Sequence, residues 1–333
     1  MSSTMSGIVD DFRDRVRTTE HLSGPQKLMI MVLSMTLYGV GDIVANIVPD
    51  LQAGPFEIGV SYFSFIAIIL AALLSPLWVA VGAPLGELIF SDLLLGNFSG
   101  FGELEGWIET ALAIYVAGSL VRNPRSVRQL AVAPIVMVLV DKVTGGIIDI
   151  TKVLIGIDPE ALEEADGLIS AILVAEGLDL VMTIVVSGVI FGAIPAVLLT
   201  PALYGKLEPI LGLRPRDPAK PPRLRGPWGA SIWAVAGLAF ALAAAIELVA
   251  TWEEYAGREG IGTFGAFEPD YIDQFGTAWI WIAAAIALVI GFVVFFVVRA
   301  VQSRRAKADS DDSVAGTTAG TSAPGPTGSD EIS

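Results

Sequence analysis

The feature that most constrains the fold of this chain is a series of uninterrupted apolar runs, each roughly 20 residues long. A helix rises about 1.5 Å per residue, so such a run matches the hydrocarbon thickness of a bilayer. The runs do not alternate with polar residues, which favours helices over the strands of a membrane barrel. We therefore predict an all-α integral membrane protein with eight transmembrane helices, at about 28–49, 57–75, 77–97, 107–122, 130–153, 168–203, 228–251 and 277–301.

The basic residues predict the orientation of these helices. Nearly all of them lie in the N-terminal segment, between the fourth and fifth runs, between the sixth and seventh, or just after the last run. In an eight-helix arrangement these four regions share one side of the membrane, and the opposite side is acidic, as in residues 158–166 and 268–273. Because basic loops stay in the cytoplasm, both termini are expected inside a multi-pass protein of the cell membrane.

The composition outside the runs divides the chain into five parts. An amphipathic helix with an apolar stripe of Ile8, Phe12 and Val16 is expected before the first run. The tail is rich in Ser, Thr, Gly and Pro, which predicts disorder. The parts are a cytoplasmic amphipathic segment (1–27), a six-helix core (28–211), a Pro- and Arg-rich cytoplasmic linker or ordinary loop (212–227), a two-helix appendage (228–301) and a disordered tail (308–333).

Several functional classes are disfavoured by what the sequence lacks. It has no cysteine, and His21 is its single histidine, so thiol chemistry and a histidine-rich metal centre are excluded. No catalytic or nucleotide-binding motif stands out, and we expect neither an enzyme nor a bound cofactor. The formal net charge of −15 argues against nucleic acid as a partner. This acidity resembles that of proteins from salt-loving archaea.

Ionisable residues inside the runs are the candidate ligand-binding residues, because a charge at bilayer depth is costly without a partner. They lie from mid-depth to the outer surface, which predicts a cavity open to the outside. Carboxylates outnumber lysine, so a cationic or polar ligand is favoured. Asp92, Glu109, Asp149 and Glu247 are interpreted as solvated near the outer interface. The candidates are Asp42, Asn46, Glu87, Asp141, Lys142, Glu176 and Asp179, of which Asp42, Glu87, Glu176 and Asp179 are expected to share one cavity or, alternatively, to form structural pairs.

Three segments carry a resemblance to a known family. They are "LLSPLWVAVGAPLGELIFSDLLLGN" (73–97), "WIETALAIYVAGSLVR" (107–122) and the long run 168–203 with its late prolines. Together with the six-helix unit, they make residues 28–211 resemble the substrate-binding S-component of energy-coupling factor transporters. The resemblance implies capture of a small nutrient from outside, in partnership with a membrane coupling subunit and ATPases.

Two other functions remain open at this point. One is an ion-coupled secondary transporter that uses Glu176, Asp179 and Asp42 as cation or proton sites. The other is a membrane scaffold protein without transport activity, which would act through its amphipathic N-terminus and its tail.

The charge distribution yields a topology prediction. Reporters fused near Arg125 and Pro218 are expected to report the cytoplasm, because both positions lie in basic connections. A reporter near Glu164 is expected to report the outside. A single reporter on the opposite side would overturn the eight-helix arrangement.

Overall fold

The computed structural model describes residues 22–46, 51–53, 56–58, 60–155, 177–218, 232–256, 260, 264, 266, 271–276 and 278–318. The predicted amphipathic helix, the candidate Glu176 and the end of the tail lie outside the described residues.

The first helix, α2 (Gly24–Ala45), begins at a capping box. The backbone N–H of Gln26 donates to the Ser23 hydroxyl at 3.4 Å, and the Gln26 side chain accepts from the Ser23 backbone at 3.0 Å. Pro25, in the first turn, loses no hydrogen bond there. The predicted first span therefore forms, a few residues earlier in the chain than expected.

A short antiparallel hairpin follows, in which β1 (Leu51–Ala53) pairs with β2 (Phe56–Ile58). The second span was predicted to begin at residue 57, and this start is wrong because Glu57 and Ile58 are in the strand. The apolar run crosses the boundary between strand and helix, so hydropathy alone does not reveal where the helix begins. The helix itself, α3, is shorter (Ser64–Leu73).

The next helix starts after a two-residue turn, Leu74 and Ser75, one residue earlier than the turn predicted at Ser75 and Pro76. It comprises α4 (Pro76–Gly86) and a π-helical continuation, η1 (Glu87–Leu93). A single 3₁₀ turn, η2 (Phe101–Glu103), then leads into α5 (Leu104–Leu120).

The remaining helices complete the bundle. Residues 177–183 are helical and continue into the π-helical η3 (Ile184–Ala193). The chain returns to α-helical geometry in α9 (Ile194–Leu203), which has Pro195 in its first turn. The elements are α6 (Val127–Ile155), η3 (Ile184–Ala193), α9 (Ile194–Leu203), α10 (Leu207–Ile210), α11 (Ile232–Tyr255), α12 (Tyr271–Phe275) and α13 (Ala278–Thr318).

The chain is a helical membrane protein. Much of the outer surface of α6, α9, α11 and α13 is apolar and exposed, including Leu198, Trp233, Leu238 and Phe292, as expected for helices that face lipid. Among the described residues, six helices are long and apolar enough to cross a membrane: Gly24–Ala45, Pro76–Leu93, Val127–Lys152, Gly177–Leu203, Trp233–Glu253 and Ala278–Val301. The other two predicted spans correspond to the shorter α3 and α5.

The short α3 lies at the centre of the bundle. Nearly all of its side chains are buried, and it packs against α2, α4, α5, α6, η3 and α9. Its residues Ala67, Ile68 and Ala71 are fully buried in the main apolar core. An element enclosed by protein on all sides is apolar all round, which explains why its sequence resembles a lipid-facing span.

The backbones of α2 and α4 touch through glycines. A Cβ atom added to Gly39 would collide with the carbonyl group of Gly86, and one added to Gly86 would collide with the Met35 carbonyl oxygen. Gly82 faces the Met31 carbonyl in the same way. Small residues at such positions let helix backbones approach closely in a membrane. This contact fixes the register of α2 against α4.

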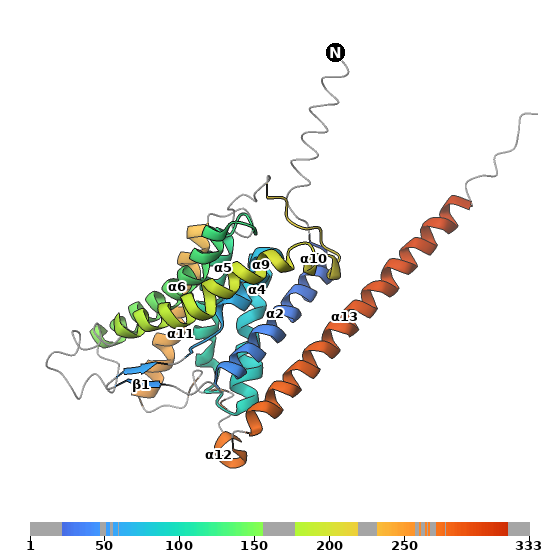
Figure 1. Cartoon of the computed structure of the whole chain (residues 1–333). Coiled ribbons are helices and arrows are strands. Elements are labelled where there is room, and N and C mark those ends of the chain that lie inside the picture. Colours follow the sequence, from blue (N-terminus) through green and yellow to red (C-terminus); the bar gives the residue numbers. More distant parts are fainter. Residues whose placement is uncertain are drawn as a thin grey trace, which may run out of the picture.

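The predicted two-helix appendage is not a separate unit. Helix α11 packs against α5 and α6, whereas α13 packs against α2 and η1 (Figure 1). Each contributes to a separate apolar cluster with core helices: Ala243 with Ile108 and Ile148, and Ala283 with Ile43 and Phe90. The two helices thus extend the core on different sides.

Two further segments can be compared with the predicted parts of the chain. The segment 212–227, predicted as a linker or an ordinary loop, lies against the bundle in its described part, up to residue 218. The Arg216 Nη1 donates to the Val121 carbonyl at 3.2 Å, and the Tyr204 hydroxyl donates to the Arg216 carbonyl. The tail predicted as disordered from 308 is helical to Thr318, because the stretch after Val301 contains no proline or glycine before Gly316.

The glycine contact predicts the effect of one substitution. Gly86→Ala should destabilise the protein by at least ~1–3 kcal/mol, because the new methyl group overlaps the α2 backbone. The matched control is Gly237→Ala, on an exposed face of α11 with open space around it, where alanine favours the helix. Thermal unfolding in detergent measures both. Equal melting temperatures for the two variants would contradict the close approach.

Candidate functional site

Two predicted site residues lie together where α2 meets η1. Asp42 is buried, with 8% of its surface exposed, and its side chain is hydrogen-bonded to Ser91. The Asn46 Nδ2 donates to the Ser91 hydroxyl at 3.2 Å and to the Asp42 backbone carbonyl at 3.1 Å. The predicted i, i+4 relation between Asp42 and Asn46 therefore corresponds to a real contact, with Ser91 between them.

A third predicted residue, Asp141, is held by two hydroxyl groups. The Tyr62 hydroxyl donates to Asp141 Oδ2 at 3.1 Å, and the Thr110 hydroxyl donates to Oδ1 at 3.4 Å. Tyr62 precedes α3, Thr110 is on α5 and Asp141 is on α6. Hydrogen bonds from neutral donors are the ordinary way to accommodate a carboxylate away from water.

Glu87 lies between these two groups. Its electrostatic neighbours include Asp42, Asp92, Asp141 and Glu103. The buried Tyr38 is close enough to interact with Asp42, Glu87 and Asp141 together. We call Asp42, Glu87 and Asp141 the carboxylate cluster. All three are candidates predicted from the sequence, and the structure brings them into one neighbourhood of α2, η1 and α6. The cavity predicted from the sequence grouped Asp42 and Glu87 with Glu176 and Asp179 instead of Asp141.

The predicted residues Lys142 and Asp179 form an ion pair, with Lys142 Nζ 2.8 Å from Asp179 Oδ2. Both side chains are partly exposed, at 30% and 50%. Lys142 follows Asp141 directly, so on a helix it points roughly 100° away from it. Asp179 therefore belongs to a pair at the edge of the carboxylate cluster.

A cavity of about 70 Å³ opens beside the carboxylate cluster. Three carboxylate residues line it, Glu87, Asp92 and Glu103, together with Trp107 and Thr110. Because Thr110 also donates to Asp141, the cavity wall is connected directly to the cluster. Of the predicted site residues, Glu87 lines this cavity, Asp42 contacts Ser91, and Asp179 pairs with Lys142.

Several residues of this site were not predicted from the sequence. Ser91, Thr110 and Trp107 are common residue types in membrane helices and carry no signal of their own. Tyr62 lies in an apolar stretch without a polar pattern, and the structure places its hydroxyl on Asp141. Glu103 was overlooked because it lies just before the predicted fourth span.

The interpretation of the outer acidic residues as merely solvated is wrong for Glu109 and Glu247, whereas Asp149 is partly exposed, with 43% of its side-chain surface accessible. Glu109 is buried, with 9% of its surface exposed. Asp149 and Glu247 both contact Lys152, at 2.7 Å and 2.8 Å. Hydropathy places these residues near the interface, but it does not reveal that α11 packs against α5 and α6 there.

The described residues do not form a metal centre. No three Asp, Glu or His side chains in this part of the chain are arranged to hold a metal ion. The arrangement instead offers separate negative charges around a small space, which suits a cation that makes one or two charged contacts.

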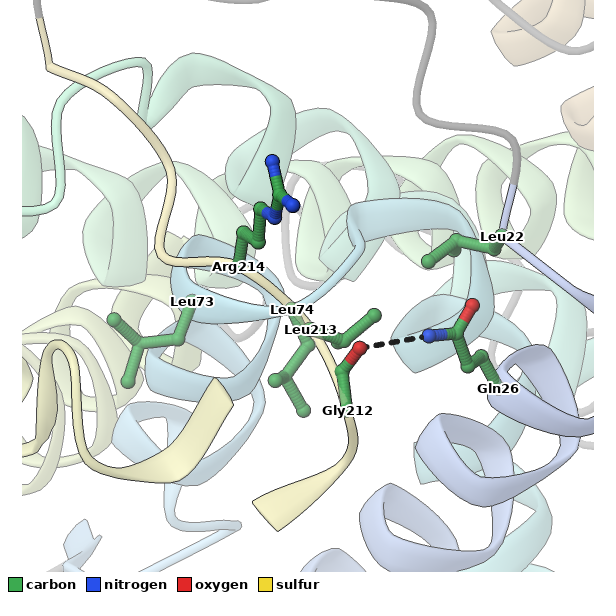
Figure 2. A pocket seen from close by; sticks show the side chains of 7 residues that line it. All are labelled: Leu22, Gln26, Leu73, Leu74, Gly212, Leu213 and Arg214. Atoms are coloured by element: carbon green, nitrogen blue, oxygen red, sulfur yellow. Dashed lines mark hydrogen bonds between the residues drawn. The ribbon is translucent and has the colours of Figure 1, made fainter. Parts of the chain in front are cut away.

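A larger hollow, about 190 Å³, lies at the other end of the bundle, near the start of α2 and the end of α3. Figure 2 shows Gln26 reaching across it to the Gly212 carbonyl, a hydrogen bond of 3.0 Å. Its other lining residues are Leu22, Leu73, Leu74, Leu213 and Arg214. Despite its size, this hollow contains none of the predicted site residues, and its walls are mainly leucine.

One protein family matches most of the chain. The model of a family of unknown function, DUF8171, matches residues 29–307. No curated protein and no solved structure matches the chain. The matched region runs from α2 into α13, so the last two long helices lie within the same family region as the first six predicted spans.

The hydrogen bond to Asp141 can be tested. Tyr62→Phe should destabilise the protein by ~1–3 kcal/mol, because a carboxylate in the bundle loses a donor while the ring remains. Tyr115→Phe is the matched control, since Tyr115 is also buried but lies outside the Asp141 network. Thermal unfolding in detergent should show a lower melting temperature for Tyr62→Phe than for Tyr115→Phe. The reverse order would contradict the role of Tyr62.

Proposed function

We propose that this chain, which belongs to the DUF8171 family of unknown function, is a membrane transport protein that captures a small cationic solute from outside the cell. The observation that carries the proposal is the cavity lined by Glu87, Asp92 and Glu103 beside the carboxylate cluster. In this proposal the protein binds and transfers the solute and does not convert it chemically.

The lining of the cavity supports a cation. Its charged lining residues are all acidic. Trp107 adds an aromatic ring, and a ring face attracts ammonium-like groups.

The volume of the cavity supports a small solute. A water molecule occupies about 30 Å³ of liquid, and pockets for drug-sized ligands measure about 300–1,000 Å³. A cavity of about 70 Å³ therefore suits a group of the size of ammonium or methylammonium. A nutrient with such a group at one end would place only that end here.

The proposed orientation puts the cavity toward the outside. In Figure 1, α10 and the C-terminal part of α13 lie toward one end of the bundle, and β1 and α12 lie toward the other. The basic residues Lys206, Arg214 and Arg304 belong to the first end, which we place in the cytoplasm. This gives eight crossings of the cell membrane, with α3 and α5 completing the set.

The resemblance of residues 28–211 to S-components supports a role as the substrate-capture subunit of a larger transporter. In that case a membrane coupling subunit and ATPases would supply the energy for transport. Helices α11 and α13 are additional to the S-component core and cover α5, α6 and α2.

An ion-coupled secondary transporter is the second candidate. The ion pair between Lys142 and Asp179 favours it, because a partly exposed pair beside buried carboxylates can exchange a partner for a transported cation. Transport by the purified protein in liposomes, driven by an ion gradient without ATPases, would favour this candidate over a capture subunit.

The cation site can be tested by binding measurements. Calorimetry on the full-length protein in lipid nanodiscs should detect methylammonium, with guanidinium, sodium, potassium and acetate as comparison solutes. Glu87→Gln and Asp92→Asn should each weaken binding at least tenfold, about 1.4 kcal/mol, because each removes a negative charge from the cavity wall.

Asp309→Asn, in the extension of α13 beyond the predicted span, is the matched control and should bind like the wild type. Failure of every cation to bind, or equal binding by all three variants, would overturn the proposal and favour a scaffold protein.

A further inference from the structure

A second polar group lies between α5, α6 and α11, apart from the cavity. At its edge, Lys152 Nζ is 2.7 Å from Asp149 Oδ1 and 2.8 Å from Glu247 Oε1. The Thr251 hydroxyl donates to the same Glu247 oxygen at 3.2 Å. The charge of this lysine is therefore already shared by two carboxylates.

Two more carboxyl groups lie deeper in this interface. Glu105 and Glu109 are one turn apart on α5, and their side chains are hydrogen-bonded to each other. Glu109 is 9% exposed, and its Oε1 is buried without a hydrogen-bond partner among the described residues. On the facing α6 is Gly145, where an added Cβ would lie 3.3 Å from Glu109 Oε2, so the carboxyl group packs close to the helix backbone.

This hydrogen bond requires a proton. An ionised carboxylate has only acceptor oxygens, so two ionised groups cannot form a hydrogen bond with each other. The charged groups that face the pair from the packed helices do not supply a free positive charge. They are Asp141, Asp149 and Lys152 on α6 and Glu247 on α11, and Lys152 already contacts two of these carboxylates.

We propose that Glu105 and Glu109 form a proton-binding site in which one proton is shared between their carboxyl oxygens. The proton comes from water and returns to water, and no other bond is made or broken. When it is bound, the pair has a single negative charge. When it leaves, two adjacent anions remain beside Asp149 and Glu247, and Lys152 is the cation nearest to them on the packed helices. This site does not depend on whether the cavity at Glu87 binds a cation.

Infrared spectroscopy of the purified full-length protein tests the proposal. A protonated carboxyl group gives a carbonyl stretching band that shifts in D₂O. An ionised carboxylate lacks this band. Part of this band should disappear in Glu109→Gln and equally in Glu105→Gln at neutral pH. In each variant the new amide N–H donates to the remaining carboxylate and replaces the proton.

Glu253→Gln is the matched control, because Glu253 is on α11 but is not among the groups that face Glu109, and it should leave the band unchanged. Bands of Glu109→Gln and Glu105→Gln that equal the wild-type band would overturn the proposal. Glu87→Gln separates the two proposals: it should weaken cation binding and leave the Glu105–Glu109 contribution intact, whereas Glu109→Gln should retain cation binding.

Discussion

The contact between the backbones of α2 and α4 determines where the acidic residues of this protein meet. Gly39 and Gly86 touch without side chains between them, so the relative position of the two helices is fixed there. Asp42 comes one turn after Gly39, and Glu87 follows Gly86 directly. The closest approach of the helices therefore places two carboxylates near each other, at the start of the π-helical η1. Wider helical turns of this kind are frequent at functional sites.

The sequence was informative where a single helix determines the outcome. Each long apolar run contains a helix in its described part, because the backbone at bilayer depth has to satisfy its own hydrogen bonds. The turn before Pro76 and the end of the sixth span at Leu203 were predictable, because proline acts locally. The choice of Asp42, Glu87 and Asp141 as candidates also followed from the cost of charge at bilayer depth, since such charges gather where they share polar partners.

The sequence was uninformative where packing between distant segments determines the outcome. Nothing in the run around residue 57 distinguishes the strand β2 from the helix after it. Hydropathy likewise cannot show that α11 covers Glu109, or that Lys152 lies between Asp149 and Glu247. The ion pair of Lys142 with Asp179 joins two helices whose relative rotation is set by η3 and α9, and no spacing rule within one helix predicts it.

The two ends of the bundle differ in a way that bears on the proposed transport function. At the end opposite the cavity, residues 205–218 connect three helices. Gln26 of α2 donates to the Gly212 carbonyl, and Arg216 donates to the Val121 carbonyl at the end of α5. Within this connecting segment (205–218, below called the strap), Leu211 and Arg216 are buried. An arginine is rarely buried without such hydrogen-bond partners. Opening a path through this end would break these hydrogen bonds and expose both side chains. A movement of the whole bundle relative to the membrane would leave the strap intact. If the protein transports a solute as proposed, the tied end therefore favours a movement of the whole bundle over an opening at this end.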